Sequence, residues 1–207
     1  MTSALPGLVA ASWRAVGRRT PVLAPATAAV LLLAVTWPLQ DGRYAGHVLH
    51  GLVLLSATVL IGATDDPAAE ICATSPHVLR LRTALRVLTG SAVALPVLAG
   101  GLTLVHLRCP QLPLTPYVVE AAGLCLVALA LGVGLRAWLD LAHPSYAASI
   151  GLIGIALVAF LLPQGWGLLE PQPWGPPWAA TRWRWLAVGL VAVGLSLAAT
   201  ADRSEGR

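Results

Sequence analysis

The chain has 207 residues, of which 57% are hydrophobic and 11% are charged, with a formal net charge of +4 at pH 7. Soluble domains carry about 25% charged residues, so this composition excludes a soluble catalytic domain and indicates a polytopic membrane protein. The three cysteines follow neither a metal-binding nor a disulfide spacing. We predict an all-α membrane protein with one transmembrane domain over residues 1–207.

The first predicted element is an amphipathic helix over residues 5–19. Its apolar residues, among them Leu8 and Trp13, recur near helical spacing, whereas Arg14 and Arg18 lie elsewhere on the helix. A basic helix with Trp on its apolar side is typical of the membrane interface. The alternative is a polar N-terminal tail.

Six apolar runs then follow, each near the 20 or so residues that a bilayer crossing needs. Nine of the thirteen arginines lie on one side of the membrane if both termini are cytoplasmic, as the positive-inside rule requires. We therefore expect both termini in the cytoplasm. The predicted spans are residues 21–39, 44–63, 83–107, 116–139, 146–163 and 185–200, the last being marginal in length.

The longest polar interruption in the first two-thirds of the chain includes the loop of residues 64–82, between spans two and three. Asp66 is suited to cap a helix, and Pro67 to its first position, where a missing N–H costs nothing. Ser75 and Pro76 repeat this signal and predict the start of a second helix. The loop is therefore expected to hold a short, exposed helix over residues 67–73.

This loop resembles the first cytoplasmic loop of permeases of the type 2 ABC-exporter class. The matching order is an acid, a small apolar stretch, Thr/Ser-Pro and then a basic start to the next span. The chain departs from the pattern where Asp65, Asp66 and Pro67 replace a charged run ahead of the acid. The residues that carry the resemblance are Glu70, Ile71, Cys72, Thr74, Ser75, Pro76 and Arg82.

The resemblance implies that the loop forms a cytoplasmic coupling helix, which docks on an ATP-binding subunit holding ATP and Mg. It also implies a second permease copy or a sister permease, a bacterial cytoplasmic membrane, and outward transport of a lipid, a hydrophobic small molecule or a peptide. Surrounding lipid is expected as a partner and nucleic acid is not. The expected partner-binding residues are Asp66, Pro67, Glu70, Ile71, Cys72, Ser75 and Pro76. The alternative is an ordinary inter-span loop whose prolines end helices.

The segment of residues 164–184 is expected to be an outer connection rich in Trp and Pro. Trp prefers the headgroup layer of a membrane. Anchoring there is the favoured interpretation, and contact with a substrate is the alternative. The aromatic residues are Trp166, Trp174, Trp178 and Trp183, with Trp185 at the edge of the segment.

Glu120 is the one acid well inside an apolar run, which makes it a candidate for the substrate path. Because Pro116 is expected to begin that helix, Glu120 should lie in its first turn, near the outer interface and favoured by the helix dipole. A structural role is the preferred interpretation unless the residue lines a cavity.

Histidines on the expected outer side provide the second hypothesis, a membrane redox or metal protein. His47 and His50 are three residues apart and so share a helical face, and with His106 they would supply ligands for a metal or a haem. A membrane scaffold without cargo is a third, weaker option. The chain has no G-x-x-x-x-G-K-[ST] phosphate loop, so we expect no enzyme activity and no cofactor in this chain itself.

Overall fold

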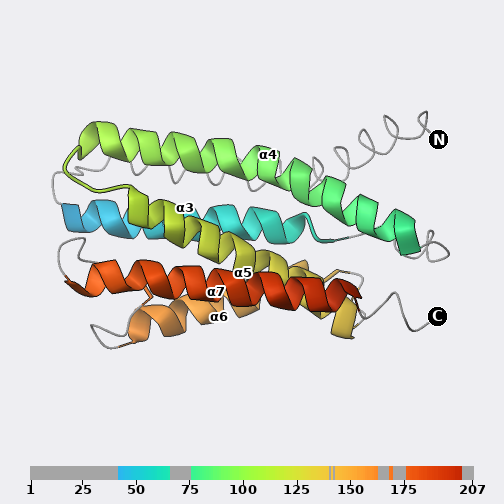
Figure 1. Cartoon of the computed structure of the whole chain (residues 1–207). Helices are drawn as coiled ribbons and strands as arrows, with labels where there is room; N and C mark the ends of the chain where they lie inside the picture. The colour runs from blue at the N-terminus through green and yellow to red at the C-terminus, as the bar shows by residue number, and fades with distance from the viewer. Residues whose placement is uncertain are drawn as a thin grey trace.

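The computed structural model describes residues 42–65, 76–139, 141, 143–162, 168–169 and 176–201. Five helices and no strands make up this part of the chain. They are α3 (Gly42–Gly62), α4 (Pro76–Arg108), α5 (Thr115–Leu139), α6 (Ser145–Leu161) and α7 (Pro176–Ala201). They run roughly alongside one another, and successive helices point in opposite directions (Figure 1).

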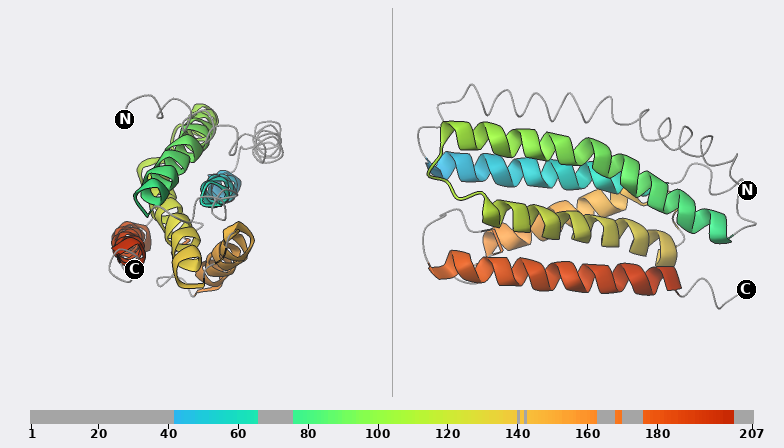
Figure 2. Two further views of the ribbon diagram at one scale, coloured as in Figure 1. Left: turned by 90° about the vertical axis from the view of Figure 1, so that its right-hand side faces the viewer. Right: turned by 45° about the horizontal axis from the view of Figure 1, so that its top comes forward.

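Helix α5 is the central element of the bundle. It packs against α3, α6 and α7, and α3 also packs against α4 and α6. The end-on view shows α5 running between the other helices (Figure 2). One end of the bundle therefore carries the start of α3 and α5 and the end of α4, and the opposite end carries the end of α3 and α5 and the start of α6.

The core follows from the spacing of apolar residues on α3 and α5. Residues recurring at three- and four-residue intervals form a continuous stripe on one helix face, and such stripes from α3 and α5 meet in the core. The fully buried members include Leu49, Leu52, Val53 and Ile61 on α3, Tyr117, Ala121, Leu124 and Ala128 on α5, Leu152 on α6 and Trp185 on α7.

Two glycines allow α7 to lie close to α5. A Cβ placed on Gly123 would come within 2.5 Å of Cε3 of Trp185, and one on Gly189 would come within 3.2 Å of Leu126 Cδ1. Small residues at a helix interface allow the backbones to approach closely. The indole of Trp185 therefore occupies space that any other residue at position 123 would fill.

The outward faces of the bundle are apolar as well as its interior. Such large apolar surfaces mark contact with a membrane or another protein. Four helices, α3, α4, α5 and α7, are long and apolar enough to cross a membrane, and α6 is a shorter apolar helix of 17 residues. Exposed residues of α6 include Ile150, Ile153, Leu157, Val158, Phe160 and Leu161, and those of α7 include Leu186, Leu190, Val191, Leu195 and Leu197.

The all-helical fold is confirmed over the described residues, and the predicted spans 44–63, 116–139 and 146–163 coincide with α3, α5 and α6 within about two residues. Pro76 begins α4, as the Ser75–Pro76 signal predicts, so residues 76–82 of the predicted loop are helical. The interfacial helix (5–19), the first span (21–39) and the coupling helix (67–73) lie outside the described residues and stay predictions.

The expected connection over residues 164–184 differs most from the structure. Helix α7 begins at Pro176 and not near Trp185, so residues 176–184 belong to the last helix. Pro176 and Pro177 suit the first turn of a helix, where backbone N–H groups have no helical partner. No Gly or Pro follows them before Trp185, so nothing in the sequence interrupts the helix.

Candidate functional site

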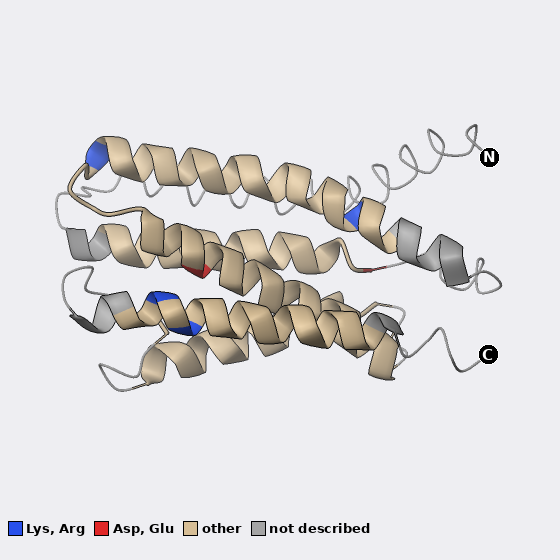
Figure 3. Ribbon diagram, viewed as in Figure 1, with Lys and Arg blue, Asp and Glu red and all other residues tan. Residues whose placement is uncertain are grey.

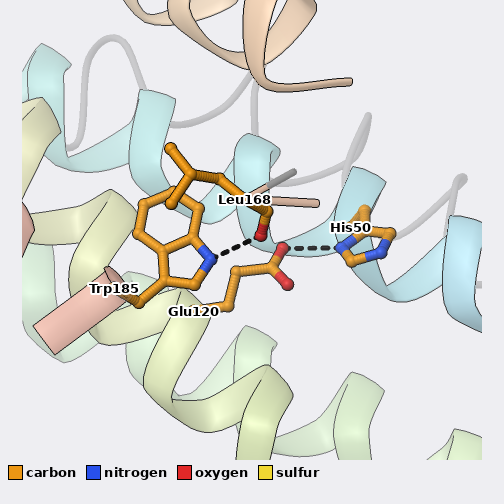
Figure 4. Close-up of polar contacts among 4 residues, drawn as sticks. All are labelled: His50, Glu120, Leu168 and Trp185. Carbon is orange, nitrogen blue, oxygen red and sulfur yellow. Dashed lines mark hydrogen bonds and ion pairs between the residues drawn. The ribbon is translucent and has the colours of Figure 1, made fainter. Parts of the chain in front are cut away.

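A buried acid–base pair joins α3 to α5 near one end of the bundle. Nδ1 of His50 and Oε1 of Glu120 are 2.6 Å apart and share a hydrogen bond, and their side chains are only 13% and 6% exposed (Figure 4). Glu120 is the sixth residue of α5, in its second turn. The prediction that it lies in the first turn is therefore wrong, because the helix begins at Thr115, one residue earlier than expected, and α3 covers the carboxylate.

Aromatic side chains surround this pair. The ring of Tyr117, one turn before Glu120 on α5, lies 5.4 Å from the ring of His50, centroid to centroid. Trp185 of α7 donates a hydrogen bond from Nε1 to the carbonyl oxygen of Leu168 at 2.8 Å, and its indole lies beside Glu120 (Figure 4). Tyr117 and Trp185 are nearly inaccessible to solvent. The carboxylate therefore has apolar ring surfaces around it, where an ionised group needs a partner.

A second polar group, which we name the Asp65 junction, consists of Thr64, Asp65, Arg86, Arg136 and Ser145 at the opposite end of the bundle. The Asp65 carboxylate accepts hydrogen bonds from the backbone N–H of Ser145 at 2.9 Å and from its hydroxyl at 2.6 Å. Arg86 donates to the Asp65 carbonyl at 2.6 Å, and Arg136 makes a longer contact of 3.5 Å with the Thr64 carbonyl. The junction joins the end of α3 to α4, α5 and α6.

Elementary helix chemistry explains the junction. The first N–H groups and last carbonyl groups of a helix lack partners within the helix. Asp65 accepts from the first residue of α6, as a capping carboxylate does, although it is 80 positions away in the chain. The two arginines donate to carbonyl oxygens just after α3, where the helix dipole favours positive charge. The charged residues that the structure describes lie toward the two ends of the bundle (Figure 3).

The sequence predictions for partner-binding residues mostly fall outside the described part of the chain. Asp66, Pro67, Glu70, Ile71, Cys72 and Ser75 are in residues 66–75, which the structure does not describe, and Pro76 is the first residue of α4. The neighbouring Asp65 and Thr64 are described and buried. The start of the predicted loop is therefore packed into the bundle.

The three histidines of the metal hypothesis do not gather into one site. His47 is exposed and packs edge-on against Phe160 of α6, His50 is bonded to Glu120, and His106 is exposed on α4. Within the described ranges, no three His, Cys, Asp or Glu side chains are placed to hold a metal ion. The second hypothesis therefore has no geometric support in this part of the molecule.

Sequence reasoning named both His50 and Glu120 but did not pair them, and it did not anticipate the role of Asp65. The available signal was the burial expected for an acid inside an apolar run, because a buried carboxylate requires a partner on a neighbouring helix. Of His47 and His50, His50 lies nearer the middle of the predicted span 44–63.

Comparisons of the chain with family models, with curated proteins and with solved structures find no match.

Proposed function

We propose that this chain is the membrane-spanning subunit of an ATP-driven ABC transporter, with six spans and both termini in the cytoplasm of a bacterial cell. Two such permeases, identical or paired with a sister, combine with two ATP-binding subunits. Its cargo is a lipid, a hydrophobic small molecule or a peptide, moved outward. The chain itself has no phosphate loop, so ATP hydrolysis with Mg takes place in the partner.

The observation that carries this proposal is the Asp65 junction. A coupling helix transmits force only if the ends of its loop are fixed to the spans that must move. Asp65 directly precedes the undescribed residues 66–75, and it is bonded to α6 through Ser145 and to α4 through Arg86. An ordinary inter-span loop needs no such attachment at its first residue.

The junction supports a specific route for coupling. A displacement of the 67–73 helix by the ATP-binding subunit pulls on Asp65 and, beyond the loop, on the start of α4 at Pro76. Asp65 passes the displacement to the start of α6, while Arg136 links the end of α5 to the same turn. Four helices then respond together at the cytoplasmic end.

Co-purification in mild detergent from the native membrane tests the proposal. An ATP-binding subunit should accompany the wild-type chain and be lost with Ile71→Asp, because a carboxylate on the docking face opposes burial. Gln111→Asp, in the exposed turn between α4 and α5 at the other end of the bundle, is the matched control and should retain the partner.

Two results would contradict the proposal. One is a wild-type chain that purifies without any ATP-binding protein. The other is an Ile71→Asp chain that keeps its partner and transports at the wild-type rate.

A further inference from the structure

We infer that the His50–Glu120 pair is a proton-binding site within the membrane-spanning bundle, holding one proton in the bond between the two side chains and a second on Nε2 of His50. The inference concerns the pair itself and does not depend on an ATP-binding partner. It assigns the ligand, a proton, to a buried acid–base contact that the coupling mechanism does not use.

The first proton follows from the geometry of the bond. A nitrogen and an oxygen 2.6 Å apart, both with lone pairs in their unprotonated forms, attract each other only when a hydrogen lies between them. With Glu120 ionised, that hydrogen is on Nδ1 of His50. The pair then consists of a carboxylate and a neutral imidazole, with a net charge of one negative unit.

The second proton has a defined place to bind. Nε2 of His50 is buried and has no hydrogen-bond partner among the residues that the structure describes. A proton on Nε2 makes the ring an imidazolium and brings the net charge of the pair to zero. Burying an uncompensated charge costs free energy, whereas a hydrogen-bonded ion pair offsets much of that cost.

The size of the ligand follows from the packing. The rings of Tyr117 and Trp185 lie beside the pair, and both residues are at most 2% exposed, as are Leu49 and Ala121, the chain neighbours of His50 and Glu120. Metal coordination by three or more side chains does not occur among the described residues. A proton is the cation that binds between these groups without displacing any of them.

Other charged or titratable groups lie on the helices at this end of the bundle. Tyr117 lies on α5 with Glu120, and His47 lies on α3, one turn from His50. Helix α4 carries His106 and Arg108, and α7 carries Arg182 and the half-buried Arg184. On α6 the one such group is Tyr146, at the opposite end.

The test is nitrogen-15 NMR of the full-length protein, labelled at histidine and held in lipid nanodiscs, over the pH range in which it stays folded. The resonances of His50 are those that vanish in His50→Gln. We expect Nε2 to change from unprotonated to protonated as the pH falls, while Nδ1 keeps its hydrogen-bonded proton throughout. A ring that keeps the same proton count over the whole range would overturn the inference.

A second measurement separates the pair from an ordinary histidine. In Glu120→Gln, His50 should remain singly protonated at a pH where the wild-type ring carries both protons, because the stabilising carboxylate is gone. The exposed His47 on the same helix is the control and should respond to pH alike in both proteins. Equal behaviour of His50 in the two proteins would also refute the site, and the wild-type measurement decides the matter if the variant fails to fold.

Discussion

At the scale of single residues, several buried polar side chains in the described part of the chain lie against a defined partner. Glu120 is one example, because His50 lies on one side of it and the indole of Trp185 on the other. A buried polar group that loses its partner keeps the full cost of having left water. The effect of a substitution here depends on what remains unpaired and not only on the bond that is removed.

Glu120→Ala should therefore lower the free energy of unfolding by about 1–3 kcal/mol, because His50 loses its acceptor in a buried setting. Glu120→Gln keeps a carbonyl oxygen that accepts from Nδ1 and should lose clearly less. The midpoints of thermal unfolding of both variants in one detergent measure the difference. Equal midpoints for Glu120→Ala and the wild type would show that the bond adds no stability.

Gly123 allows a residue-scale test of packing. Gly123→Val should destabilise the bundle by about 1–3 kcal/mol, since extra carbons in a filled core force their neighbours to move, and the first of them would lie 2.5 Å from the Trp185 ring. Gly194→Val on α7 is the control, because a Cβ there has no atom within 4 Å. Thermal midpoints measure the effect, and equal losses from the two variants would contradict this account.

At the scale of helices, the ends matter more than the middles. The apolar stripes that join α3, α5 and α7 tolerate many apolar side chains, whereas the end of α3 is held by directed hydrogen bonds from three other helices. The Asp65 side chain is buried, and Ser145 compensates for the loss of water by supplying two hydrogen-bond donors to its carboxyl group. One carboxylate therefore ties the start of α6 to the end of α3.

Asp65→Ala should release the start of α6 and reduce stability by about 1.5–3 kcal/mol, the usual range for hydrogen bonds to a charged group. Ser145→Ala removes the hydroxyl bond but leaves the backbone N–H bond, so its effect should be smaller. Hydrogen exchange at the Ser145 amide should accelerate in Asp65→Ala alone. Unchanged exchange in that variant would show that Asp65 does not cap α6.

The positions of most of the described helices were predictable from the sequence. Apolar runs and proline signals identified the helices, because both act locally: Pro76 begins α4 as predicted, and Thr115–Leu139 matches its predicted span. The start of α7 was missed because Trp and Pro were interpreted as loop residues, although two prolines fit the first turn of a helix. The pairing of His50 with Glu120 and of Asp65 with Ser145 could not be derived, since separations of 70 and 80 residues leave the choice to tertiary packing.

At the scale of the whole molecule, the two polar sites lie at opposite ends of one bundle. The ends of α3 and α5 that bear the Asp65 junction lie away from their starts, which bear His50 and Glu120 (Figure 1). If the chain crosses the membrane as proposed, the acid–base pair lies toward the outside and the junction toward the cytoplasm. The arginine distribution in the sequence predicts the same orientation.

Cysteine labelling in intact cells tests this orientation. With the three native cysteines replaced, Gln111→Cys in the turn before α5 should react with a membrane-impermeant maleimide, and His143→Cys before α6 should react only after the membrane is permeabilised. Both positions are exposed in the structure, so access to reagent and not burial decides the result. The reverse pattern would place the junction outside and exclude coupling to a cytoplasmic ATPase.

Helix α6 has a consequence for the lipid around the molecule. Its 17 residues span about 26 Å at 1.5 Å per residue, which is less than the roughly 30 Å thickness of a bilayer's hydrocarbon layer. Asp65 fixes one end of α6 to the bundle. The helix therefore cannot shift along its axis to divide the difference between its length and the bilayer thickness over the two leaflets. If α6 crosses the bilayer as proposed, the acyl chains beside it must compress, so the protein should partition into thinner membrane regions and lose stability in bilayers of long-chain lipids.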